Sequence, residues 1–167
     1  MVDQGDTAAE WLTAFLETPA RLVAMSADYR RPVHPQLPRE FDGRLTFADA
    51  SPLLVVGSES LADLNARLET PLPMNRFRPN IVIDGCPPYA EGGWDRILVG
   101  DLVLERLAPC GRCAITTTDQ ASAERGKEPL TTLATYRRDP DFGVIFGSYY
   151  GHTTIGRLAV GDAVTVG

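Results

Sequence analysis

Two cysteines separated by two residues, Cys110 and Cys113, are the strongest candidates for chemistry in this chain of 167 residues. A pair with this spacing is compatible with a dithiol redox site or with half of a zinc site. It is also compatible with a single thiolate that completes a metal held by an organic cofactor. Arg112 lies between the two thiols, and a neighbouring cation favours the thiolate, which is the form that binds metal.

The surrounding sequence disfavours the first two kinds of site. A thioredoxin-type pair needs its first cysteine at a helix N-terminus, whereas residues 113–119, "CAITTTD", are typical of a strand. A zinc site needs four clustered ligands, and beyond the pair the chain offers Cys86, His34 and His152, all widely separated. Two interpretations stay open: buried apolar cysteines beside a turn, or one cysteine that completes a cofactor-held metal.

A second candidate site is the segment "NRFRPN", which carries Arg76 and Arg78 on a backbone restricted by Pro79. Two guanidinium groups at the mouth of a strand suit bidentate recognition of a phosphate or carboxylate. A solvated basic turn is the alternative interpretation. Asp49 and Ser51 are polar loop residues that could add contacts.

Composition limits the classes of partner. The formal net charge is −6 and the arginines are scattered, so we expect no nucleic acid as main partner. No apolar run approaches the ~20 residues that span a bilayer, and we expect no membrane partner. Three cysteines are an odd number, and no secretory signal opens the chain, which favours a reducing compartment. We therefore expect a cytoplasmic protein.

The elements that must position these residues are short. Thr7 and Glu10 form a predicted capping box for a first helix, with Trp11 and Phe15 on one face. Two more helices are predicted after Ser58 or Ser60 and from Pro129. We expect strands at 21–26, 44–49, 52–57, 80–85, 94–108 (a hairpin bent at Gly100-Asp101), 113–119, 142–150 and 155–167.

This order of elements shows no βαβ alternation. It therefore predicts an α+β domain with a β-barrel-like sheet and about three peripheral helices. No internal repeat or linker divides the chain, so we expect a single domain over residues 1–167.

Several segments, taken in order, resemble the MOSC domain, which is the C-terminal domain of molybdenum cofactor sulfurases. The resemblance is nearest to the branch of the mitochondrial amidoxime reducing component and its bacterial relatives, and we expect this chain to lack the N-terminal β-rich segment of that family. It implies a MOSC-type mixed β-barrel that binds molybdenum through a pyranopterin. The segments are "FRPNIVIDG" (77–85), "GDLVLERLAPCGRCAITTTD" (100–119), "KEPLTTLATYR" (127–137), "FGSYY" (146–150) and "VGDAV" (160–164).

The resemblance also assigns roles to residues. Cys113 is expected to be the molybdenum ligand and the catalytic residue, and Arg78 to grip the phosphate or pterin of the cofactor. Cys86 matches a family cysteine that does not touch the metal. The other expected cofactor contacts are Asn80, Ser51, Gly111, Arg112 and Tyr149.

The implied activity is the reduction of N–O bonds in small N-hydroxylated substrates by a molybdenum-dependent oxidoreductase. Electrons would come from a separate donor protein, which would be a flavin, haem or iron–sulfur reductase. The alternative is a non-catalytic carrier or sulfur-transfer module for molybdenum cofactor, in which Cys113 carries a persulfide. In either case the protein supplies position and access, while the hard chemistry belongs to the cofactor.

Overall fold

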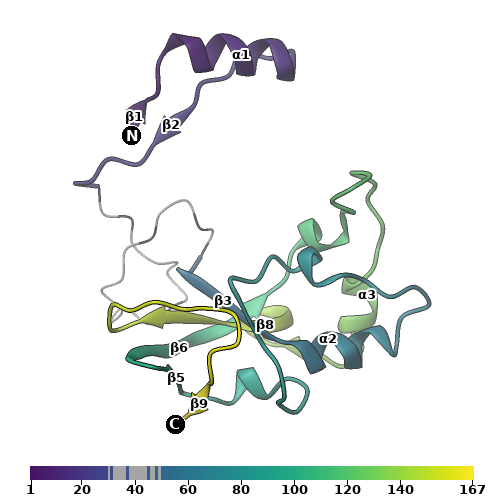
Figure 1. Cartoon of the computed structure of the whole chain (residues 1–167). Helices are drawn as coiled ribbons and strands as arrows, with labels where there is room; N and C mark the ends of the chain where they lie inside the picture. The colour runs from purple at the N-terminus through teal and green to yellow at the C-terminus, as the bar shows by residue number, and fades with distance from the viewer. Residues whose placement is uncertain (30, 32–36, 38–44, 46–47, 49) are drawn as a thin grey trace.

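A curled mixed sheet of seven strands forms a half-barrel at the centre of the molecule (Figure 1). The computed structural model describes residues 1–29, 31, 37, 45, 48 and 50–167. The strand order is β4–β3–β8–β6–β5–β9, and β7 also pairs with β8. The strands are β3 (Leu53–Gly57), β4 (Ile81–Ile83), β5 (Arg96–Val99), β6 (Leu102–Gly111), β7 (Arg138–Asp139), β8 (Gly143–His152) and β9 (Thr165–Val166).

The described residues form three α-helices, so the predicted α+β fold with about three helices is confirmed. Short 3₁₀-helices form several of the connections. The α-helices are α1 (Asp6–Leu16), α2 (Ser58–Asn65) and α3 (Leu130–Leu133), and the 3₁₀-helices are η1 (Met74–Arg76), η2 (Ala90–Gly92) and η3 (Ala114–Thr117).

The fold contains one βαβ unit, although the order of elements in the sequence shows no βαβ alternation. β3 and β4 pair in parallel, with Val56 opposite Val82, and α2 lies between them in the chain. A parallel pair needs such a crossover, because a tight turn joins only antiparallel strands. β4 has three residues, which is too short to show a clear period in the sequence.

The long antiparallel pairing of β6 with β8 joins the two sides of the sheet. Both strands have ten residues, and their register shifts between Arg106 and Ala108 and again between Pro109 and Gly111. The hairpin predicted at Gly100-Asp101 is confirmed and leads from β5 into β6. The predicted strand over 44–49 lies mostly outside the described residues.

Alternation along β3 divides the core between the two faces of the sheet. Leu54 and Val56 point to one face, and Val55 points to the other. The first cluster consists of Leu54, Val56, Leu64, Phe77, Cys110, Leu133 and Phe146. The second consists of Val55, Ile83, Ile97, Val99, Leu102, Leu104 and Tyr150.

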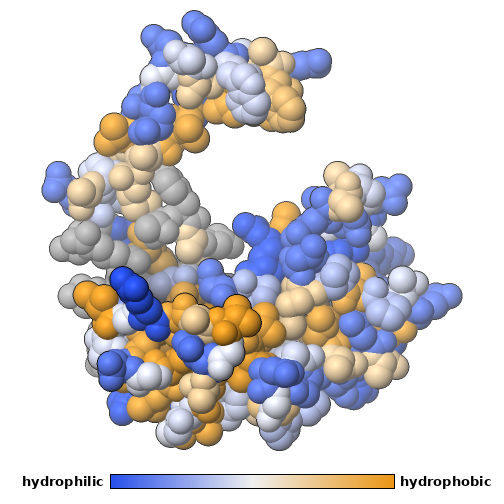
Figure 2. Space-filling view, viewed as in Figure 1, coloured by the Kyte–Doolittle hydropathy of each residue, from blue (hydrophilic) through white to orange (hydrophobic). Residues whose placement is uncertain are grey.

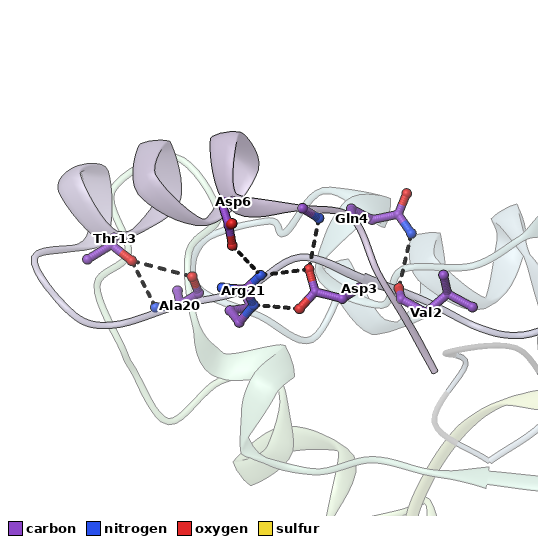
Figure 3. Close-up of polar contacts among 8 residues, drawn as sticks. Val2, Asp3, Gln4, Asp6, Thr13, Ala20 and Arg21 are labelled. Carbon is purple, nitrogen blue, oxygen red and sulfur yellow. Dashed lines mark hydrogen bonds and ion pairs between the residues drawn. The ribbon is translucent and has the colours of Figure 1, made fainter.

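Residues 1–24 form an N-terminal arm that extends away from the sheet (Figure 1). It contains α1 between the paired strands β1 (Val2–Asp3) and β2 (Val23–Ala24). Arg21 forms ion pairs with Asp3 and Asp6 (Figure 3). The hydrogen bond from Arg21 is the main cause of the lowered pKa of the Asp3 carboxyl.

The apolar face predicted for α1 exists, but its large side chains are exposed. Trp11 and Phe15 stack with ring centroids 5.4 Å apart, and Figure 2 shows hydrophobic surface on the arm. The predicted capping box is wrong, because Gly5 precedes the helix and no side chain caps it. No described helix has both the length and the apolar character of a membrane span.

The close approach of β8 to its neighbour β3 requires a glycine at position 147. Gly147 has φ +75°, and a Cβ there would lie 2.7 Å from Val56 Cγ2 and 2.8 Å from the Val55 carbonyl oxygen. Gly100 is a matched position, because it has φ +56° but open space around it. A comparison of alanine substitutions at these two glycines therefore distinguishes the effect of backbone strain from that of steric overlap.

We expect Gly147→Ala to lower the free energy of unfolding by about 3 kcal/mol or more, since left-handed strain and overpacking add. Gly100→Ala should cost only the strain, about 1–2 kcal/mol. Urea denaturation of the two variants measures the difference. Equal losses would contradict the close approach of β8 to β3.

Candidate functional site

The chain leaves the sheet at the end of β6 and turns directly into η3, and Cys113 lies at this turn. It has extended backbone angles (φ −105°, ψ 177°) and immediately precedes Ala114. Its carbonyl oxygen accepts two hydrogen bonds from Thr116, from the amide at 3.2 Å and from Oγ1 at 3.0 Å. The thiol is exposed and has no hydrogen-bond partner among the described residues. Cys113 is therefore the accessible thiol of the pair.

Cys110 differs from Cys113 in its exposure and in its hydrogen bonds. It is 1% exposed and belongs to the first core cluster. Arg112 Nη1 donates to its sulfur at 2.9 Å, and Nη2 donates to the Phe77 carbonyl oxygen at 2.7 Å. The guanidinium carbon also lies 5.6 Å from the centre of the Phe77 ring. The interpretation as buried apolar cysteines thus holds for Cys110 and fails for Cys113.

The contact with Phe77 joins the cysteine loop to the second predicted site. Phe77 follows η1 and precedes Arg78, whose backbone is left-handed (φ 55°). Arg78 is exposed, and its guanidinium has no hydrogen bond or ion pair with the described residues. Arg76 is 9% exposed and bonds to η3 instead, so the pair of anion-binding arginines predicted from "NRFRPN" reduces to Arg78.

Asn80 and Tyr149 lie in one row across the sheet. Asn80 Oδ1 accepts from the Leu54 amide at 2.8 Å, and the Asn80 amide donates to the Leu54 carbonyl at 2.9 Å. Leu54 pairs with Tyr149 on β8, which in turn pairs with Ala108 on β6. Tyr149 is half-buried against the first core cluster. The side-chain oxygen of Asn80 is therefore already hydrogen-bonded to the sheet.

Ser51 and Gly111 have clear structural roles. Ser51 is buried, and its hydroxyl donates to the Tyr150 carbonyl oxygen at 3.1 Å. Gly111 lies so close to the next segment that a Cβ there would be 2.4 Å from the Phe142 carbonyl oxygen. The close approach of backbone to backbone requires glycine at this position. Their predicted contacts with a cofactor stay predictions.

The third cysteine is held as a thiol. Cys86 Sγ is half-buried and lies 3.7 Å from Glu59 Oε2. Burial is the main cause of a pKa raised to about 11, and the nearby carboxylates of Glu59 and Glu91 raise it further. His152 is exposed at the end of β8, and His34 lies outside the described residues.

The side chains of this site suit a metal ion that takes most of its ligands from an organic cofactor. Within the described part of the chain, no group of three or more His, Cys, Asp and Glu side chains could hold a metal ion. The site offers one exposed sulfur donor at Cys113 and one uncommitted cation at Arg78, on loops joined by Arg112. An exposed cysteine sulfur and an uncommitted guanidinium on joined loops suit a metal chelated by an anionic, phosphate-bearing organic ligand.

Sequence reasoning did not predict the contacts that support this site. Thr116 and Arg76 are buried, and Phe77 supplies the carbonyl that Arg112 binds. The predicted strand over 113–119 is wrong, since Ala114–Thr117 in its middle form η3. The hydroxyls of Thr116 and Thr117 bond to carbonyls three residues earlier, at 3.0 and 2.8 Å. Such bonds stabilise threonines in a conformation other than a strand. A run of threonines in the sequence does not indicate that these bonds will form.

Comparison with known proteins identifies the class to which this fold and site belong. Residues 42–165 match the family model of the MOSC domain. The chain therefore belongs to the MOSC domain family, and the family predicted from its motifs is confirmed.

Curated relatives of this chain include amidoxime reducing components. The chain is 42% identical over 175 residues to mitochondrial amidoxime-reducing component 1 of Homo sapiens. It is 40% identical over 175 residues to mitochondrial amidoxime reducing component 2 of Bos taurus. Both comparisons cover 97% of this chain, but 51% of the human protein and 52% of the bovine one. The chain thus spans about half the length of the curated relatives it matches.

The predicted cytoplasmic location is wrong by this comparison, because the matched relatives are named as mitochondrial proteins. The prediction used an odd number of cysteines and the lack of a secretory signal. Both features bear on secretion and disulfide formation. Neither distinguishes the cytoplasm from another compartment in which thiols stay reduced.

The three cysteines should react with iodoacetamide in a fixed order. We expect Cys113 to react first because its thiol is exposed, and Cys110 to react only after unfolding. Cys86 should be slow at pH 8, where a pKa of about 11 leaves roughly a thousandth of it as thiolate. Peptide mass spectrometry gives the three rates, and Cys86 should accelerate tenfold per pH unit up to about pH 10. Comparable rates for Cys110 and Cys113 would contradict the placement of the pair.

Proposed function

We propose that this chain binds molybdenum cofactor and reduces N-hydroxylated small molecules. Membership of the MOSC domain family and the named amidoxime reducing relatives support this activity. The observation that carries the proposal is the exposed Cys113 thiol on a loop that Arg112 joins to the uncommitted Arg78. We further propose that residues 1–167 act as a single domain.

Each residue of the site has a proposed task. The Cys113 thiolate binds the metal, and Arg78 donates two hydrogen bonds to the anionic group of the cofactor. Arg112 holds the two loops in register through Phe77 and Cys110. The side-chain Nδ2 of Asn80 and the Tyr149 side chain contribute polar contacts at the row across the sheet.

The bound cofactor would supply the two-electron chemistry that cleaves an N–O bond. The protein provides orientation, access for a small substrate and electrostatic support. We propose that a separate protein delivers the electrons. A flavin, haem or iron–sulfur reductase would fill that role.

The second candidate function is a carrier or sulfur-transfer module for the cofactor. The exposed thiol of Cys113 favours it, since an accessible cysteine is also suited to carry a persulfide. The two functions differ in turnover. A carrier binds the cofactor and reduces neither a hydroxylamine nor an amidoxime with any electron donor.

The first variant to test is Cys113→Ala, made in a host that synthesises molybdenum cofactor. We expect near-stoichiometric molybdenum in the wild type and less than a tenth of that in the variant, with an unchanged fold. Cys86→Ala is the matched control and should retain its metal, because Cys86 lies outside the proposed site. Elemental analysis per chain measures both. Metal in Cys113→Ala at the wild-type level would remove Cys113 as the ligand.

The second variant is Arg78→Met, which keeps a long side chain but removes the cation. A charge-assisted hydrogen bond is worth about 1.5–3 kcal/mol, so cofactor affinity should fall about 10- to 100-fold. Arg96→Met is the control, because Arg96 is also exposed but is paired with Glu105 on β6. Cofactor dissociation followed by absorbance gives the two affinities. Equal affinities would show that Arg78 does not bind the cofactor.

A further inference from the structure

We propose that Arg76 is a positioning residue for Cys113, because it holds η3 in the one conformation that sets the direction of the thiol. This inference rests on the proposed function for its meaning. Its physical content concerns only residues of this chain. It can therefore be tested without any bound cofactor.

The environment of Arg76 shows that its guanidinium is directed at η3. The residue is 9% exposed, and Nη1 donates to the Thr116 carbonyl oxygen at 3.3 Å. Nη2 lies 3.6 Å from Asp119 Oδ2. Nε is buried and has no partner among the described residues. Burial of a guanidinium with so few hydrogen bonds and ion pairs costs free energy. An apolar side chain at this position would pack at lower cost.

Thr116 transmits this contact to Cys113. It is fully buried, and both its amide and its hydroxyl donate to the Cys113 carbonyl oxygen, at 3.2 and 3.0 Å. Two donors on one carbonyl restrict the ψ angle of Cys113 and hence the orientation of the peptide that follows it. Arg76, Thr116 and Cys113 thus form a continuous series of hydrogen bonds from η1 to the thiol-bearing residue.

The far end of η3 is held by the same arginine. Asp119 accepts hydrogen bonds from the amides of Ala121 and Ser122, at 2.9 and 3.0 Å. These bonds are the main cause of its lowered pKa, and the nearby charge of Arg76 lowers it further. The carboxylate is therefore ionised at neutral pH and offers a fixed anion to Nη2. Arg76 binds both a carbonyl of η3 and the turn that follows it.

Arg76 and Arg112 join the same two segments in opposite directions. Arg76 reaches from η1 to a carbonyl of η3, and Arg112 reaches from the cysteine loop to the carbonyl of Phe77. A planar guanidinium serves two acceptors at once, which a lysine ammonium does with less directional control. We therefore expect a lysine at position 76 to restore the function of Arg76 only in part.

The test compares Arg76→Met, Arg76→Lys and the control Arg96→Met, all without cofactor. Mass spectrometry follows the alkylation of Cys113 and the amide hydrogen exchange of peptides that cover residues 114–118. We expect Arg76→Met to accelerate both at least threefold, because η3 is no longer fixed. Arg76→Lys should fall between Arg76→Met and the wild type, and Arg96→Met should match the wild type. Exchange in β6 and β8 should stay unchanged.

Thr116→Val provides a second test if Arg76→Met does not fold. It removes the hydroxyl bond to Cys113 and should also accelerate alkylation, and the double variant should show no further increase, because both residues act in one series. A folded Arg76→Met protein with wild-type alkylation and exchange would overturn the proposal. A wild type that binds no molybdenum would instead refute the proposed function and leave these measurements interpretable.

Discussion

The pairing of β6 with β8 is the constraint on which the rest of the structure depends. β8 also pairs with β3 and β7, so its register determines where every neighbouring segment meets the sheet. The two register shifts in β6 occur just before the cysteine loop. Irregularities of this kind bend a strand and redirect its side chains. Because of them, Cys110 ends inside the core, and the chain leaves the sheet before it reaches Cys113.

Three arginines share the space around this loop and have different environments. Arg76 is buried behind η3, Arg112 lies between Cys110 and Phe77, and Arg78 is exposed without a partner among the described residues. Two of them stabilise the loops, and only the third is free for a ligand. This division explains how a chain with a net charge of −6 still presents an uncommitted cation on a segment that Arg112 joins to the cysteine loop.

Much of the fold was predictable because its strands are strongly patterned. The apolar run of β3 and the turn residues Gly100-Asp101 indicated their elements correctly. η3 was not predictable, because β-branched residues favour strands, whereas Thr116 and Thr117 bond to nearby carbonyls here. The helix α1 was located, but its supposed inward face is exposed, since periodicity does not identify what covers a face.

The sequence by itself determined the family and singled out Cys113 and Arg78, because those features depend on residue identity and order along the chain. The tertiary structure decided which cysteine is exposed, which arginine is free, and which carbonyl each buried guanidinium binds. Those properties depend on contacts between segments far apart in the chain. The burial of Cys110, for example, results from its packing against Phe77 and Phe146, and no local pattern around residue 110 encodes that contact.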